Sequence, residues 1–140
     1  VGGQADDIDG CRTPTVEALE SVHRRKTGAM ISVSLALGAM TAGADRPRIE
    51  ALAEYGCRLG LAFQITDDLL DVQGDEQAVG KRLQKDAKDG KLTFPGLLGV
   101  EASLRRAEQL VTEACDALEA LGRRAQGLRA LARYVLERNR

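Results

Sequence analysis

The chain has 140 residues, of which 44% are hydrophobic, 20 are lysine or arginine, and 21 are aspartate or glutamate. This length and composition predict one folded domain and exclude a disordered chain. The formal net charge of −1 argues against a general nucleic-acid-binding protein, and the longest apolar runs are too short to span a bilayer. Three widely spaced cysteines form no metal-binding motif, which predicts reduced thiols in a cytoplasmic protein.

The first predicted helix runs from about residue 13 to 41 and begins at a threonine–proline pair. Its apolar residues recur at helical spacing and form one stripe, which consists of Val16, Leu19, Val22, Ala29, Val33, Leu37 and Met40. Lys26 falls on this stripe, where its ammonium group either reaches out to solvent or meets an anion. Thr27 and Gly28 favour the anion, because a hydroxyl group and an open backbone let phosphate approach. His23, the only histidine, is interpreted as a boundary residue without a chemical role.

A second long helix is predicted over residues 47–73. Gly43 is expected to end the preceding helix, and Asp45 is expected to cap this one. Gly56 and Gly60 are four residues apart within it, so they lower its intrinsic stability but permit close packing against a neighbouring helix.

A cluster of carboxylates lies in the last part of that helix, at Asp67, Asp68 and Asp71. At about 100° per residue, Asp67 and Asp71 share nearly one face, Asp68 lies on the adjacent edge, and Gln64 lies one turn earlier. The acids border the apolar stripe formed by Leu52, Gly56, Leu59, Phe63 and Leu70. Carboxylates at a core boundary repel one another unless a cation neutralises them, and oxygen ligands at this spacing suit Mg2+. The alternative is a solvated helix edge that binds nothing.

The segment of residues 74–92 is polar, and Gly74 is expected to end the second helix. Lysines recur through the segment at Lys81, Lys85, Lys88 and Lys91. Such a segment is either a solvated loop or a loop that folds over a polyphosphate.

The rest of the chain is also predicted to be helical. The expected elements are a short helix over residues 96–100, a helix over residues 101–121, a turn bracketed by Gly122 and Gly127, and a last amphipathic helix. No segment alternates apolar and polar residues with enrichment in β-branched side chains, so the chain is predicted to be all-α.

The motifs, in this order and spacing, resemble those of the trans-isoprenyl diphosphate synthases, the farnesyl and geranylgeranyl diphosphate synthase group of the polyprenyl synthetase family. The residues that carry the resemblance are Val1-Gly-Gly-Gln4 with Asp7, Lys26-Thr27-Gly28, Phe63 to Asp71, Gly80-Lys81, Asp86, and Gly90 to Gly99. A DDxxD motif alone is weak evidence, but one preceded by FQ and followed by GK and GKxTFP is specific. The resemblance covers most of residues 1–100 and implies the C-terminal helices of an isoprenoid-synthase bundle.

The resemblance also implies a reaction and its residues. An allylic diphosphate (dimethylallyl, geranyl or farnesyl) ionises with the help of Mg2+, and isopentenyl diphosphate then lengthens it by one isoprene unit. The implied ligands of Mg2+ are Asp67, Asp68 and Asp71. The residues implied to bind the diphosphate are Lys26, Gln64, Lys81 and Lys91. The residues implied to take part in catalysis are Lys26, Thr27 and Gln64.

One part of the family pattern is absent from the chain. The family carries a first aspartate-rich motif on an earlier helix, together with basic residues that bind isopentenyl diphosphate, and Asp6, Asp7 and Asp9 lack its spacing. We therefore expect residues 1–140 to be the C-terminal portion of one synthase domain, inactive alone. Its uncovered apolar faces are expected to favour a homodimer or other homo-oligomer. In the family, the length of the prenyl chain in the product depends on residues just before that first motif.

Two other classes remain as alternatives. A non-catalytic all-α interaction domain explains the amphipathic helices but not the ordered motifs. A class I terpene cyclase shares the helical architecture and the Mg2+–diphosphate chemistry, although the aspartate motif here has the synthase form.

Overall fold

The computed structural model describes residues 15–78 and 92–138. Helices occupy most of these two ranges, and neither contains a strand, which confirms the all-α prediction. No helix within them is both long enough and apolar enough to cross a membrane.

The elements follow the predicted order. α2 (Val16–His23), the π-helical turn η1 (Arg24–Gly28) and α3 (Ala29–Thr41) run on from one another, and α4 (Arg46–Ala78) follows after a turn. The remaining elements are α5 (Phe94–Leu98), α6 (Val100–Ala117), the 3-10 turn η2 (Glu119–Ala125) and α7 (Gln126–Glu137).

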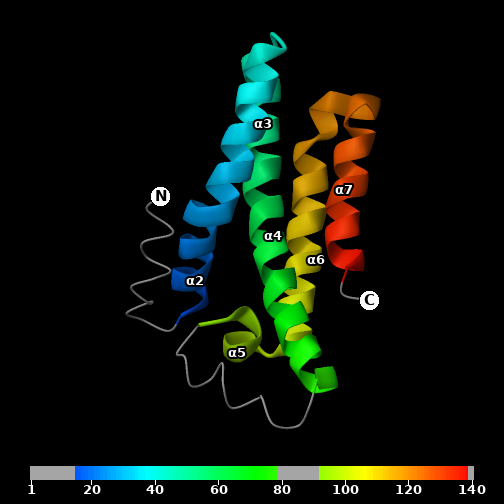
Figure 1. The fold of residues 1–140 in the computed structure, drawn as a ribbon. Helices are drawn as coiled ribbons and strands as arrows, with labels where there is room; N and C mark the ends of the chain where they lie inside the picture. The colour runs from blue at the N-terminus through cyan, green and yellow to red at the C-terminus, as the bar shows by residue number, and fades with distance from the viewer. Residues whose placement is uncertain (1–14, 79–91, 139–140) are drawn as a thin grey trace.

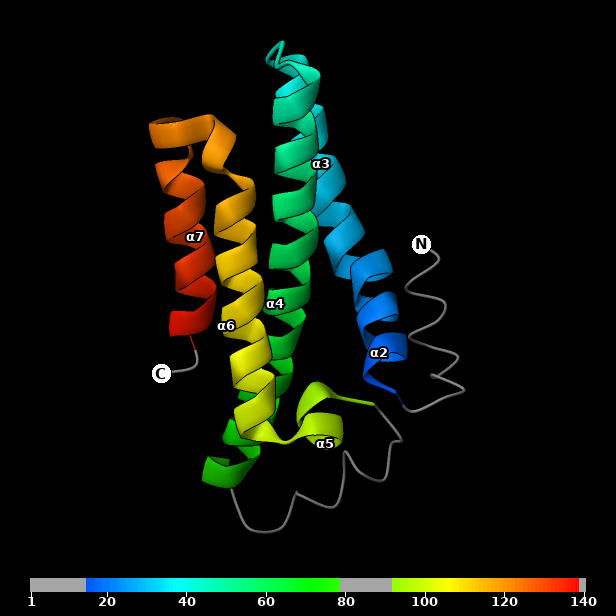
Figure 2. The ribbon, with the colours of Figure 1, turned by 180° about the vertical axis from the view of Figure 1, so that it is seen from behind.

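The helices form an open layer centred on α4. Figures 1 and 2 show α3, α4, α6 and α7 side by side, with α5 across one end near α2. α4 contacts α3 and η1 on one side and α6 on the other. In the described ranges, α3 contacts neither α6 nor α7, so parts of the layer stay uncovered by other helices.

The ends of the first two long helices agree in part with the predictions. α2 begins after Thr15, whose hydroxyl group accepts a hydrogen bond from the Ala18 amide, whereas the predicted threonine–proline pair lies outside the described residues. Gly43 ends α3 with a φ of +70°, and the Asp45 carboxylate accepts from the Arg48 amide, as predicted. The end predicted for α4 is wrong, because α4 continues past Gly74; one interior glycine costs a long helix only about 1 kcal/mol.

The stripe predicted for the first helix is buried only in its first part. Leu19 and Val22 are buried, but the second part of the helix exposes large apolar side chains at Met30, Val33, Leu37 and Met40. The turn η1 lies between the two parts of the helix. Because a π-helical turn holds more residues than an α-helical one, side chains beyond η1 point in a different direction from the one that a regular helix would give them. Beyond η1, Ser32 faces α4 and its hydroxyl group donates to the Ala53 carbonyl oxygen over 2.8 Å.

The stripe predicted for α4 is too narrow. Leu61, Ile65 and Leu69 are buried although they lie outside it, and Leu70, which lies within it, is only half-buried. The reason is that α4 has helices on two sides and buries more than one face. Asp68, predicted to border the core, is therefore inside it, with 5% of its surface exposed.

Backbone-to-backbone packing of α4 against the first helix confirms the role predicted for its glycines. A Cβ atom on Gly60 would lie 2.6 Å from Gly28 Cα, and one on Gly56 would lie 2.7 Å from Ser32 Cα. No side chain fits at either distance, so these two glycines set how closely the helices approach.

The C-terminal part differs from the prediction in detail. α6 ends at Ala117, and the turn that follows contains Gly122 with a φ of +54°. Gly127 does not bracket this turn, because it lies inside α7. The core that α6 forms with α4 and α5 consists of Tyr55, Leu59, Ile65, Phe94, Ala107, Leu110, Ala114 and Leu118, among others.

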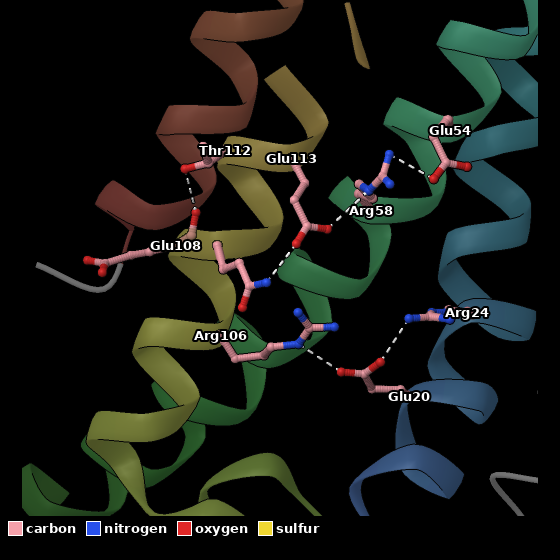
Figure 3. A network of polar contacts seen from close by, with 9 residues as sticks. Glu20, Arg24, Glu54, Arg58, Arg106, Glu108, Thr112 and Glu113 are labelled. Atoms are coloured by element: carbon pink, nitrogen blue, oxygen red, sulfur yellow. Dashed lines mark hydrogen bonds and ion pairs between the residues drawn. The ribbon is translucent and has the colours of Figure 1, made fainter. Parts of the chain in front are cut away.

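Ion pairs join the helices on the side shown in Figure 3. Glu20 on α2 accepts from Arg106 on α6 over 2.9 Å and from Arg24 over 2.8 Å. Arg58 on α4 bonds Glu113 on α6 over 3.2 Å. Such partly exposed pairs contribute little stability each, but these connect α2, η1, α4 and α6 in one arrangement.

We predict that Gly60→Ala lowers the free energy of unfolding by about 3 kcal/mol, because its Cβ would collide with the Gly28 backbone. Gly38→Ala is the matched control, since no atom lies within 4 Å of its Cβ position in α3. That change should stabilise the protein by up to about 1 kcal/mol. Urea denaturation followed by circular dichroism measures the free energy of unfolding of both variants. If the two substitutions changed it equally, the close contact at Gly60 would be contradicted.

A second prediction concerns Tyr55, which is fully buried and donates to the Leu128 carbonyl oxygen over 2.7 Å. Burial, with a smaller contribution from Cys115, raises the pKa of Tyr55 to about 12. An unfolded tyrosine ionises near pH 10, so the stabilisation is complete below about pH 10 and is lost as pH rises towards 12. The stability difference between the unaltered protein and Tyr55→Phe should therefore shrink over this interval. Parallel stability–pH curves would contradict the assignment.

Candidate active site

A cavity of about 370 Å³ lies where η1, α4 and α7 come together. Its lining residues are His23, Lys26, Gln64, Asp67, Asp68, Leu70, Asp71 and Arg138. The cavity thus brings together Lys26, Gln64 and the three aspartates that the sequence proposed as one site. Lys26 lies on η1 and the aspartates lie on α4, so the fold brings together at this cavity the groups that the family resemblance had assigned to one site.

Of the other proposed residues, the structure describes only Thr27. Thr27 lines a neighbouring hollow on the α3 side, which Lys26 also borders, together with Ala29, Met30 and Val33. Lys26 therefore stands between a polar cavity and a largely apolar surface. Lys81 and Lys91 lie outside the described residues, so their proposed roles remain predictions.

The π-helical turn η1 presents Lys26 and Thr27. It spans Arg24 to Gly28, and its last residue is the one that touches Gly60 of α4. Gln64 follows Gly60 by one helical turn and the aspartates follow by two or three. The contact between the two glycines therefore fixes the position of Lys26 relative to Gln64 and the carboxylates.

The three carboxylates have different surroundings. Asp68 is buried, and its Oδ2 accepts a hydrogen bond from the Phe94 amide over 3.0 Å. Asp67 is partly exposed, and its Oδ1 lies 3.3 Å from an Arg138 guanidinium nitrogen. Asp71 is exposed. Of the three carboxylates, Asp68 is therefore the one that is buried and hydrogen-bonded to a buried backbone amide.

Arg138, at the end of α7, also lies over the Phe63 ring, 4.9 Å from its centroid. Its positive charge beside Asp67 reduces the repulsion among the carboxylates. Arg138 was not among the predicted site residues, because it lies far from the aspartate motif along the chain and no sequence pattern indicates a contact between them.

The donor set suits Mg2+, which binds one or two carboxylates together with substrate phosphates. In the described part of the chain, no group of three histidine, cysteine or acidic side chains converges as a complete metal site. Asp67, Asp68 and Asp71 all line the cavity, and Asp67 and Asp71 lie on successive turns of α4.

His23 is the second residue whose place the sequence did not predict. The boundary position proposed for it is wrong, since only 4% of its surface is exposed and it lines the cavity. Its ring stacks on Phe94 with the centroids 5.7 Å apart and the planes inclined by 23°. The helical stripe gave no hint of this contact, because Phe94 comes from a distant segment.

The fold and the cavity together define an all-α protein with a lysine and an aspartate cluster facing one cavity. The chain belongs to the polyprenyl synthetase family, whose model matches residues 1–125. It is 43% identical to the farnesyl diphosphate synthase of Escherichia coli, over 99% of this chain and 48% of that relative. It is 39% identical to the geranylgeranyl diphosphate synthase of Cyanophora paradoxa, over 99% of this chain and 47% of that relative.

Solved structures are similar as well. A decaprenyl diphosphate synthase from Rhodobacter capsulatus matches with a TM-score of 0.81 and 28% identity, over 99% of this chain and 56% of that one. An FPP/GFPP synthase from Zymomonas mobilis matches with a TM-score of 0.77 and 34% identity, over 96% of this chain and 44% of that one. The chain spans about half the length of the curated relatives it matches.

Proposed function

We propose that the protein carrying this chain is a trans-prenyltransferase that joins an allylic diphosphate to isopentenyl diphosphate, as a farnesyl or geranylgeranyl diphosphate synthase does. The observation that carries the proposal is the cavity at which Lys26 and Gln64 meet the aspartates of a DDxxD motif. Membership of the polyprenyl synthetase family and relatives named as prenyl diphosphate synthases support it.

The cavity has the charges that the first chemical step requires. The allylic C–O bond breaks and both of its electrons leave with the diphosphate, so positive charge near that group lowers the barrier. Asp67, Asp68 and Asp71 would hold Mg2+, which supplies such charge when it is bound. Lys26 would bind the same diphosphate from η1, and Lys81 and Lys91 would add to it.

The remaining steps require a dry environment beside the diphosphate. The allylic carbocation would lie near Thr27 and Gln64, and Met30 and Val33 on α3 would shield it from water. A new C–C bond then forms from the double bond of isopentenyl diphosphate, and loss of a proton restores a double bond. The hollow beside Thr27 supports this arrangement, because apolar side chains form much of it.

We further propose that these 140 residues supply only part of the machinery. Among the two aspartate-rich motifs that the family resemblance implies, they contain the second, and they lack the basic residues that would bind isopentenyl diphosphate. The isolated chain should therefore show no prenyl transfer, whereas the whole protein should be active. Measurable turnover by the isolated chain would contradict this.

Asp71→Asn tests the role of the carboxylates with little risk to folding, because Asp71 is exposed. In the whole protein, we predict that it lowers kcat/KM for prenyl transfer by at least about 100-fold, since a charge that holds the cation is lost. The assay measures extension of geranyl diphosphate by labelled isopentenyl diphosphate with Mg2+.

Asp116→Asn is the matched control, because Asp116 is an exposed aspartate on α6 outside the cavity. It should leave kcat/KM unchanged within about twofold. A folded whole protein without activity in Mg2+, or equal effects of both substitutions, would contradict the proposed function.

We also propose a cytoplasmic homodimer or other homo-oligomer. Cys57 and Cys115 are not disulfide-bonded, as expected in a reducing compartment. Leu37 and Met40 on α3 lie outside the hollow beside Thr27 and are 57% and 59% exposed, which is unusual for neighbouring large apolar side chains.

A final prediction tests this apolar pair in the isolated chain. Leu37→Glu should lower its apparent mass in analytical ultracentrifugation, because a charge in the pair opposes burial between copies. Ala130→Glu on α7 is the control, since its side chain is exposed on a helix that does not contact α3 within the described residues. A monomeric unaltered chain would contradict self-association through α3.

A further inference from the structure

Asp68 has its orientation set by a residue far along the chain. Its Oδ2 accepts from the Phe94 amide, and both residues are buried. A buried carboxylate without such a donor would be costly, so this bond is strongly favoured. Because one oxygen is bound to a fixed backbone group, the carboxylate cannot turn freely about its terminal torsion. A cation entering the cavity therefore meets Asp68 in one orientation.

The Phe94 amide is itself held in place from two directions. Phe94 is the first residue of α5, whose N-cap is Thr93, with its hydroxyl group accepting from the Gly96 amide over 3.3 Å. The amides of a first helical turn lack partners within their helix, which explains why this one is available to Asp68. On the other side, the Phe94 ring is completely buried and stacks on His23.

His23 connects this arrangement to the lysine side of the cavity. It is the last residue of α2, directly before the turn η1 that presents Lys26. The His23–Phe94 stack therefore joins α2 to α5, and the hydrogen bond from the Phe94 amide to Asp68 joins α5 to α4. The His23–Phe94 stack and this hydrogen bond thus connect α2 to α4 through α5, and both His23 and Asp68 line the cavity.

We propose that His23 and Phe94 are positioning residues for Asp68. The stack fixes the Phe94 amide, the amide fixes the Asp68 carboxylate, and the carboxylate is thereby preset for a divalent cation. Neither ring touches the cation. This inference rests on the proposed function in one respect, namely that Asp68 helps to bind a divalent cation.

The test measures Mn2+ binding to the whole protein by electron paramagnetic resonance of the free ion. His23→Leu keeps an apolar side chain of similar size in the core but removes the planar ring. It should weaken Mn2+ binding at least about tenfold, which is the usual effect of losing a group that orients a metal ligand. Raising the Mg2+ concentration should restore prenyl transfer by this variant, so KM for the metal changes more than kcat.

His23→Phe is the conservative variant, because it keeps an aromatic ring against Phe94. It should bind Mn2+ within about twofold of the unaltered protein. Val135→Ala is the control for lost stability, since Val135 is buried in α7, which does not contact α5 in the described ranges. It should lower the melting temperature without changing Mn2+ binding.

Three results would overturn the inference. If His23→Leu melts earlier, as Val135→Ala should, yet binds Mn2+ normally, the stack serves packing alone. Weak binding by both His23→Leu and His23→Phe would mean that ring stacking is not the means of positioning. Absence of Mn2+ binding in the unaltered protein would overturn the proposed metal site and this inference with it.

Discussion

The contact between Gly28 and Gly60 is the constraint on which the candidate site depends. A Cβ atom on Gly60 would lie 2.6 Å from Gly28 Cα, so α4 and the π-helical turn η1 meet backbone to backbone. Lys26 precedes this contact by two residues on one element, and Gln64 and the aspartates follow it on the other. A side chain at Gly60 would collide with the backbone of η1 and push the lysine away from the carboxylates. The close approach thus has a chemical consequence as well as a structural one.

The sequence predicted what depends on local pattern and on recurring motifs. It predicted the all-α class, the cap at Asp45, the close packing at Gly60 and the meeting of Lys26 with the aspartates. Contacts between distant segments were not predictable, and these are the ones that bury His23 against Phe94 and bring Arg138 to Asp67. Uncovered apolar faces were expected, but the change in direction of the apolar stripe beyond η1 was not, because a π-helical turn changes the helical phase that pattern analysis assumes to be constant.

The arrangement of the helices agrees with a chain that provides one side of a larger site. α4 is covered by helices on two sides, whereas α3 exposes a row of large apolar side chains and contacts neither α6 nor α7 within the described ranges. The chain also spans about half the length of the relatives it matches. In the proposed reaction, these residues would bind the diphosphate that leaves, and the carbon that accepts the new bond would lie along the apolar side of Lys26.

The central claim is that Lys26 and the aspartates of α4 hold one diphosphate through a divalent cation. The most direct measurement is a crystal structure of the whole protein with Mn2+ and an unreactive thio analogue of an allylic diphosphate, with Mn2+ located by anomalous scattering. The account predicts an anomalous peak at the carboxylates of Asp67, Asp68 and Asp71, with the diphosphate between that ion and the Lys26 ammonium group. An ion or diphosphate bound away from these residues would contradict it.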